Sequence, residues 1–223
     1  RALAMDEQSF GLDHPEVAIR LNNLAALLQA TNRLAEAEPL MRRALVMDEQ
    51  SFGPEHPRVA VCLNNLAQLL QATNRLTEAE PLMRRALAMD EQSFGPEHPN
   101  VATDLNNLAR LLQDTNRLAE AEPLMWRALA MDEQSFGLDH PSVATDLNNL
   151  ARLLQDTNRL GEAEPLMRRA LVILHQFTAA TGYSHPALGV FSQNYTLLLL
   201  AAGRTPEQAQ AELQGVMASS HQP

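Results

Sequence analysis

The sequence contains no lysine, a single cysteine and few aromatic residues. All 17 basic residues are arginines, and with 27 acidic residues the formal net charge is −10. An acidic chain without a basic tract is a poor candidate for binding nucleic acid or anionic membranes. The single cysteine, Cys62, excludes an internal disulfide framework and an all-cysteine zinc site.

Long apolar runs, phosphate-binding loops and targeting sequences are also missing. No apolar run reaches the roughly 18 residues that a transmembrane helix needs, so we expect no membrane span. We find no glycine-rich phosphate loop and no serine or cysteine in a nucleophile motif. No signal peptide is visible, and we expect a cytoplasmic location.

The 223 residues are organised as an array of repeats. Leu-Asn-Asn-Leu begins at residues 21, 63, 105 and 147, a spacing of 42 residues, and His-Pro recurs at the same interval from His14. A fifth, diverged copy begins at His185, after an insertion of three residues around 176–184. We therefore divide this single array into a partial repeat 1–13, full repeats 14–55, 56–97, 98–139 and 140–184, and a diverged C-terminal repeat 185–223.

Each repeat is expected to form two helices. Leu21 and Leu28 share one helical face after His-Pro, and the proline suits the first turn of a helix. A second helix, from about residue 34 to residue 51, carries Ala37 and Met41 on its apolar face. Between the two helices, Asn32 tolerates the left-handed backbone that a tight turn requires.

The spacing of small and large residues resembles the tetratricopeptide repeat. The residues that match are Leu24, Ala25, Leu28, Asn32, Leu34, Ala37, Met41 and Ala44. The 42-residue length, together with Leu-Asn-Asn-Leu-Ala and Ala-Glu-Pro-Leu, resembles the kinesin light chain type of that repeat. HEAT-type repeats have a similar length but lack this small-residue pattern. The resemblance implies an all-α, right-handed superhelical solenoid of antiparallel helix pairs, whose first helices line a concave surface.

The histidines give no indication of a metal site. His14, His56, His98 and His140 recur once per repeat, and a solenoid holds them a full repeat apart. We interpret them as groups that start helices or bridge repeats, and we expect no metal, no cofactor and no enzymatic activity. Cys62 stands where other repeats have arginine or aspartate, and we interpret it as a partly exposed thiol without a role.

The repeats differ mainly on the side of the first helix opposite the core. At 100° per residue, the positions equivalent to 16, 19, 23, 26 and 30 point away from the apolar face, and four of these five vary. The fifth is asparagine in every copy, at Asn23, Asn65, Asn107, Asn149 and Asn194. Residues equivalent to Asn22 are expected to bridge adjacent helices.

This pattern predicts a binding groove. An asparagine amide offers donors and an acceptor, so a row of them would bind the main chain of an extended peptide. Gln68, Arg110 and Arg152 occupy variable positions of the same side, and the arginines would pair with carboxylates of a partly acidic ligand. Val190 and Leu197, on the apolar first helix of the fifth repeat, would accept an apolar anchor. Alternatively, these positions drift freely, and Arg110 pairs with Asp114 one helical turn away.

The leading hypothesis is a protein-interaction module that binds an extended peptide segment in the groove. The alternatives are a sensor or regulatory region of a larger signalling or defence protein, and a scaffold that self-associates through the exposed ends of the array. Because the chain opens within the second half of a repeat, we expect residues 1–9 to be loosely held or to find a substitute partner. Two possibilities stay open for the apolar helix of the fifth repeat. Either residues 177–183 fold over it, or it leaves an exposed apolar patch.

Overall fold

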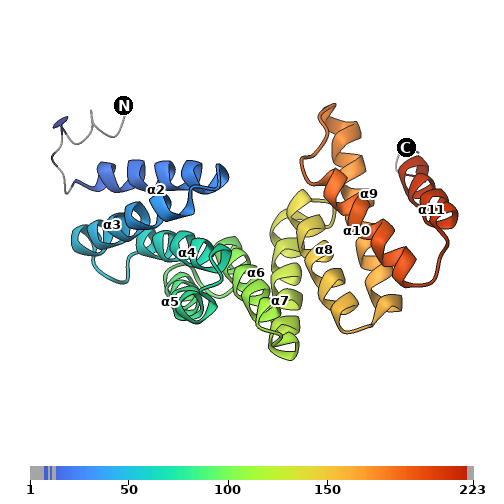
Figure 1. Cartoon of the computed structure of the whole chain (residues 1–223), viewed down its shortest axis with the longest axis horizontal. Helices are drawn as coiled ribbons and strands as arrows, with labels where there is room; N and C mark the ends of the chain where they lie inside the picture. The colour runs from blue at the N-terminus through green and yellow to red at the C-terminus, as the bar shows by residue number, and fades with distance from the viewer. Residues whose placement is uncertain (1–7, 10, 12–13, 220–223) are drawn as a thin grey trace. The chain divides into compact units, whose positions relative to one another are not determined.

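The computed structural model describes residues 8–9, 11 and 14–219 and is helical almost throughout this part of the chain. These residues form ten helices and no strand, which confirms the all-α prediction (Figure 1). The helices are α2 (Pro15–Ala30), α3 (Leu34–Phe52), α4 (Pro57–Ala72), α5 (Leu76–Phe94), α6 (Pro99–Asp114), α7 (Leu118–Phe136), α8 (Pro141–Asp156), α9 (Leu160–Thr181), α10 (Leu188–Ala201) and α11 (Pro206–Ser219).

The chain divides into two compact units, Arg1–Leu111 and Leu112–Pro223. In the first unit, α2 pairs with α3 and α4 pairs with α5, while α4 also contacts α3 and α2. In the second unit, α8 pairs with α9 and contacts α7, and α10 packs against α8, α9 and α11. Each unit is therefore a stack of helix pairs in which neighbouring repeats cover one another.

The core is built from the apolar faces that the repeat pattern predicts. In the first unit, Val17, Ala18 and Leu21 of α2 pack with Ala44 and Met47 of α3. The same cluster recurs one repeat later at Val59, Ala60, Leu63, Ala86 and Met89. The alanines let the helices approach closely, and the flexible methionine side chains fill the remaining gaps.

The predicted turn at Asn32 and its equivalents is confirmed. Asn32, Asn74, Asn116 and Asn158 adopt left-handed backbone with φ between 57° and 59°, and each connects the two helices of a pair. Gly53 ends α3 at φ 87°, in a conformation that residues with a Cβ rarely adopt. Because each turn allows only a few residues between helices, the pairs are held antiparallel.

The histidines start helices, as predicted. The His14 Nδ1 atom accepts a hydrogen bond from the backbone N–H of Glu16 at 3.2 Å, and His56, His98 and His140 cap their helices in the same way. The His56 ring also stacks on Phe52, with ring centroids 4.7 Å apart. His98 and His140 stack on Phe94 and Phe136 in the same way, so these three imidazoles link the end of one repeat to the beginning of the next.

The three inserted residues lengthen a helix. Helix α9 has 22 residues, whereas α3, α5 and α7 each have 19, and Gly182 ends it in left-handed backbone. Tyr183 is exposed, and Val190 and Leu197 of α10 are 56% and 52% exposed. Of the two possibilities for the fifth repeat, the structure therefore shows the exposed apolar patch. The expectation of a loosely held segment 1–9 falls mainly on residues 1–7, which lie outside the described part of the chain.

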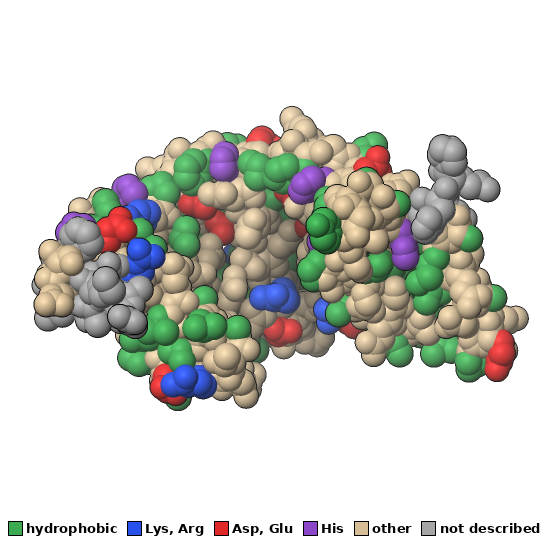
Figure 2. All heavy atoms as spheres, turned by 90° about the horizontal axis from the view of Figure 1, so that it is seen from above, with side chains coloured by type: hydrophobic (Ala, Val, Ile, Leu, Met, Phe, Trp, Pro, Cys, Tyr) green, Lys and Arg blue, Asp and Glu red, His purple; other side chains and the backbone are tan. Residues whose placement is uncertain are grey.

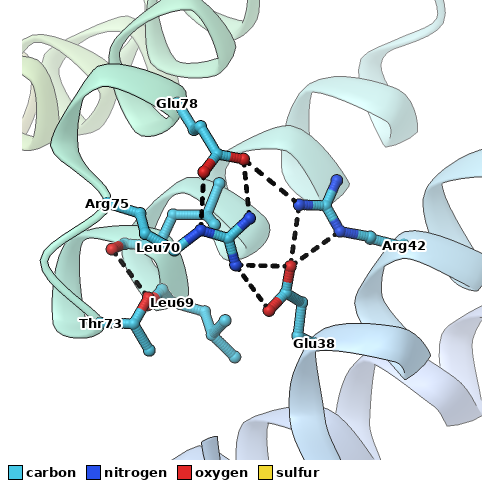
Figure 3. A network of polar contacts seen from close by, with 7 residues as sticks. All are labelled: Glu38, Arg42, Leu69, Leu70, Thr73, Arg75 and Glu78. Carbon is cyan, nitrogen blue, oxygen red and sulfur yellow. Dashed lines mark hydrogen bonds and ion pairs between the residues drawn. The ribbon is translucent and has the colours of Figure 1, made fainter. Parts of the chain in front are cut away.

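Arginines before the second helices connect successive repeats by ion pairs. Arg75 donates to the Glu38 carboxylate of the preceding repeat at 2.8 and 2.9 Å and to Glu78 of its own helix at 2.7 Å (Figure 3). In the second unit, Arg159 binds Glu122 and Glu162 in the same way. Exposed pairs of this kind contribute about 0.2–1 kcal/mol each, so they support the stacking that the core determines.

We predict that Asn74→Ala destabilises the chain by about 1 kcal/mol, because alanine resists left-handed backbone. Asn74→Gly serves as the matched control and should lie within roughly 0.5 kcal/mol of the parent, because glycine adopts this conformation readily. Urea unfolding of the three proteins provides the measurement. Equal stability of the alanine and glycine variants would show that backbone strain does not operate at this turn.

Candidate functional site

The side of the first helices opposite the core is here named the first-helix face. In the first unit, it carries Asn23 on α2, Asn65 and Gln68 on α4, and Asn107 and Arg110 on α6. In the second unit, it carries Asn149 and Arg152 on α8, and Val190, Asn194 and Leu197 on α10. None of these ten predicted side chains is buried, so each is oriented toward the surface as the helical geometry predicts.

A pocket of about 210 Å³ opens on this face between α4 and α6, and is here named the central pocket. It brings together three of the predicted residues, Asn65, Gln68 and Asn107. The other lining residues are Val61, Asn64, Asp90, Asn100, Thr103 and Asp104. Amide groups from two successive repeats therefore surround one open space.

A second pocket, of about 190 Å³, lies between α2 and α4 and is here named the N-terminal pocket. Asn23 and Asn65 line it, so Asn65 faces both pockets. Its other lining residues are Ile19, Asn22, Asp48, Arg58, Val61 and Cys62. The asparagine row is thus continuous along the first-helix face of the first unit.

Two predicted residues make contacts with neighbouring helices. The exposed Arg110 places its Nη2 atom 3.5 Å from Oε1 of Gln71. In the second unit, the Asn194 amide donates to Oδ1 of Asn148 at 3.0 Å, so α8 orients this side chain. Arg152 is exposed on α8. The apolar residues Val190 and Leu197 lie on α10, whose packing against α8 brings the two surfaces next to each other.

Below the first-helix face, a buried polar layer connects adjacent repeats. Asn22 donates through Nδ2 to the Cys62 sulfur at 2.9 Å, and the thiol donates to Oδ2 of Asp48 at 3.2 Å. One repeat later, Asn64 Nδ2 donates to Oδ1 of Asp104 at 2.5 Å. The predicted bridging role of these asparagines is confirmed.

The expectation of a partly exposed Cys62 is wrong. The residue is only 1% exposed, because its side of α4 faces the preceding repeat instead of solvent. Burial raises the pKa of the Cys62 thiol to about 12, with the nearby Asp48 charge acting in the same direction against the Asn22 hydrogen bond. The thiol therefore stays protonated at neutral pH and acts as a hydrogen-bonding member of the layer.

Two buried carboxyl groups face the central pocket, and the sequence analysis did not identify them. Asp90 of α5 is 4% exposed and Asp104 of α6 is 2% exposed. Burial raises the pKa of both, and the pKa of Asp104 reaches about 7 because the Asp90 and Glu91 charges outweigh the hydrogen bond from Asn64. Asp132 and Asp146 hold the equivalent positions in the second unit and are also buried, and burial raises the pKa of Asp132.

Two further pockets, of about 580 and 270 Å³, lie in the second unit away from the predicted residues, and Glu164 and Arg168 line both. No described helix combines the length and apolar character of a membrane span. Among the described residues, no three His, Cys, Asp or Glu side chains gather as metal ligands would. On the side drawn in Figure 2, the coloured basic and acidic side chains lie singly or in small groups. The pockets of the first-helix face are the ones that contain the predicted residues, so they are the candidates for recognition developed below.

Comparison with known proteins agrees with this architecture. A family profile of the tetratricopeptide repeat matches residues 1–50, 20–92, 75–134 and 105–174. The chain belongs to the tetratricopeptide repeat family. Tetratricopeptide repeats are generally protein-interaction scaffolds, and this family membership confirms the predicted repeat type. Among curated protein sequences, none matches this chain.

Solved structures of kinesin light chain-like tetratricopeptide repeat arrays share its fold. One contains nearly identical repeats assigned to a kinesin light chain of Podosopora anserina, with 23% identity and a TM-score of 0.74 over 95% of this chain and 100% of the other. BtubC (BKLC) from P. vanneervenii has 25% identity and a TM-score of 0.74 over 94% of this chain and 84% of its own. MamA from Desulfovibrio magneticus RS-1 is more distant, at 13% identity and a TM-score of 0.54 over 92% and 97% of the two chains.

We predict that Asp104→Asn stabilises the fold increasingly as pH rises. Because the native pKa of Asp104 is about 7, above its ordinary value of 3.8, native Asp104 keeps a proton that the unfolded chain has lost between those two values. This group therefore favours folding at low pH, and that contribution falls as pH rises toward 7. Asparagine keeps an acceptor for Asn64 without a charge. The variant should exceed the parent by roughly 1–3 kcal/mol at about pH 8 and by much less at about pH 4. An equal difference at both pH values would contradict the assignment.

We also predict that the Cys62 thiol reacts with an aromatic disulfide reagent only after unfolding. Burial and the raised pKa keep the thiolate scarce and inaccessible in the native protein. The measurement compares the labelling rate in buffer with that in denaturing urea, using free cysteine as the reference. Native labelling as fast as that of the free amino acid would show that the thiol is exposed.

Proposed function

We propose that the chain is a protein-interaction module that binds an extended peptide segment on its first-helix face. One observation carries this proposal. In the central pocket, the amides of Asn65, Gln68 and Asn107 from two successive repeats converge on one open space. Family membership supports the same class of function, since tetratricopeptide repeats generally bind other proteins.

The asparagines suit the recognition of a peptide main chain. Each amide offers two N–H donors and a carbonyl acceptor, so it would bind a peptide C=O and N–H together. Asn23, Asn65 and Asn107 recur once per repeat in the first unit, whereas the residues beside them change. The constant residues would hold any extended main chain, and the varied residues would select its side chains.

The second unit adds features that suit particular ligand side chains. Arg152 on α8 would pair with a ligand carboxylate, and Asn149 on the same helix would bind a peptide main chain. Val190 and Leu197 expose apolar surface on the neighbouring helix α10. An exposed apolar patch beside polar groups is typical of an interaction site, so these residues would accept an apolar anchor. The proposed ligand is therefore a partly acidic peptide with an apolar residue.

Two other arrangements are compatible with the same fold. The chain would then serve as the regulatory region of a larger signalling or defence protein, or as a scaffold that self-associates. Light scattering separates the scaffold from the binding module, because only the scaffold forms larger species as concentration rises. The proposed setting is the cytoplasm.

We predict that Asn65→Ala/Asn107→Ala weakens peptide binding by roughly 1–3 kcal/mol, because it removes two main-chain contacts. The free energy of unfolding should change by less than about 0.5 kcal/mol, because both amides lie at the surface. Peptides are selected from a displayed random library on the parent protein, and their affinities are then measured by calorimetry for parent and variant.

The matched control is Gln92→Ala/Gln134→Ala, which removes two exposed amides from the second helices α5 and α7. It should bind the selected peptides as the parent does. A further variant, Arg110→Ala/Arg152→Ala, should weaken acidic peptides, and this loss should diminish as salt rises. Should the selected peptides bind the asparagine variant as tightly as the parent, the first-helix face is not the site.

A further inference from the structure

In the N-terminal pocket, the chain supplies its own cation to a buried carboxylate. The Arg58 Nη2 atom lies 3.3 Å from Oδ1 of Asp48, which is only 2% exposed, and donates to the Pro15 carbonyl at 3.2 Å. The same guanidinium lies over the Phe52 ring, 4.6 Å from its centroid. A carboxylate, a carbonyl and an aromatic face thus form a complete receptor for a guanidinium group.

The junction that holds the central pocket repeats these receptor residues without the arginine. One repeat of 42 residues further along, the equivalents of Asp48, Phe52 and Pro15 are Asp90, Phe94 and Pro57, whereas Asn100 replaces Arg58. The Phe94 ring stacks on His98 with a centroid distance of 4.6 Å, as Phe52 stacks on His56. The receptor residues are kept, and the residue that would fill the receptor is not.

The central pocket also contains one more carboxyl group than the N-terminal pocket. Asp104 takes the place of Cys62, so two carboxyl groups replace one. Within the described residues, Oδ1 of Asp90, Oδ2 of Asp104 and Oδ1 of Asn64 are buried without a hydrogen-bond partner. All three residues line the central pocket. Buried acceptors without a donor are costly, and a ligand with several donors would satisfy them.

We propose that the central pocket binds the guanidinium group of an arginine side chain of the partner peptide, between Asp90 and Asp104. The proposal rests on the proposed function and adds a specific residue class to it. A guanidinium presents five donors in a planar fork that matches carboxylate oxygens, and it packs on aromatic rings. A metal ion fits less well, because among the described residues no third His, Cys, Asp or Glu joins the two aspartates.

With this pocket, the proposed site would select a ligand that carries charges of both signs. Arg110 and Arg152 would favour carboxylates at other positions, while Asp90 and Asp104 require a cation at one defined position. Because the two carboxyls are buried, an uncharged side chain there would leave their oxygens unsatisfied. Selected peptides should therefore share one arginine in an otherwise acidic or neutral sequence.

The first test removes the charges of the pocket and keeps its shape. In peptides selected on the parent protein, replacing the shared arginine by citrulline should weaken binding by roughly tenfold to a hundredfold, because the charge-assisted bonds are lost. Asp90→Asn/Asp104→Asn should lower the affinity for the arginine peptide to a similar extent and remove most of the difference between the two peptides. The isosteric asparagines keep the fold, which circular dichroism monitors.

The second test introduces an arginine of the chain itself into the central pocket. Asn100→Arg places an arginine where Arg58 stands in the preceding repeat, so it should pair with Asp90 and compete with the ligand. We expect it to raise the midpoint of thermal unfolding by about 2–4 °C and to lower the affinity for the arginine peptide by roughly tenfold or more. Asn100→Gln is the matched control, without a charge, and should do neither.

The outcomes separate this inference from the proposed function. Peptides that need Asn65 and Asn107 but bind the arginine and citrulline forms equally would overturn the arginine pocket and leave the peptide site intact. Peptides unaffected by the asparagine variant would overturn the peptide site itself. Calorimetry with calcium chloride alone supplies the last comparison. Calcium binding that Asp90→Asn/Asp104→Asn abolishes, without any preference for arginine, would identify the pocket as a metal site and contradict the proposal.

Discussion

A helix pair of this repeat cannot bury its own apolar face, and the structure depends on neighbouring repeats covering it. The alanines at the contacts between helices allow the close approach that this burial needs, and leucines and methionines fill the interior. The arginine ion pairs and histidine caps operate across the same junctions, but their exposed or local contacts contribute far less than the core. Each junction between repeats is therefore both the source of stability and the place where the surface can change.

The polar layer at these junctions connects stability with recognition. It lies between the apolar core and the first-helix face, so a substitution there alters a pocket while the core stays unchanged. At one junction, Cys62 donates a hydrogen bond to Asp48 and Arg58 forms an ion pair with it. At the next, Asp104 and Asn100 leave buried oxygens facing an open pocket. Near-identical repeats thus differ in the polar groups at a junction through two positions.

Much of the fold followed from periodicity, because the signals are local. The 42-residue spacing placed the helix pairs from α2 to α9. Asn32 and its equivalents marked the turns, and histidine followed by proline marked the helix starts. The orientation of Asn65 and Gln68 followed from helical geometry alone. Three inserted residues were recognised, but their effect on α9 was not, since helix length there depends on packing after the repeat ends.

The buried carboxyls could not be predicted in the same way. Asp90 lies near the end of a polar run, and position 104 belongs to a set that contains arginine, cysteine and aspartate in different repeats. Both positions flank the apolar face, so their burial is decided by how closely the next repeat approaches. The available signal was the mixture of residue types at position 104 and its equivalents. A position that holds a thiol in one repeat and a carboxyl in the next indicates that the polar contacts differ from one junction to another.

The most direct measurement is a crystal structure of the chain bound to a peptide selected on it. We expect an extended peptide on the first-helix face, with its main chain bonded to the amides of Asn65 and Asn107 and an arginine guanidinium between the carboxyls of Asp90 and Asp104. A peptide bound to the second helices or to an end of the array, with the central pocket filled only by water, would contradict this expectation.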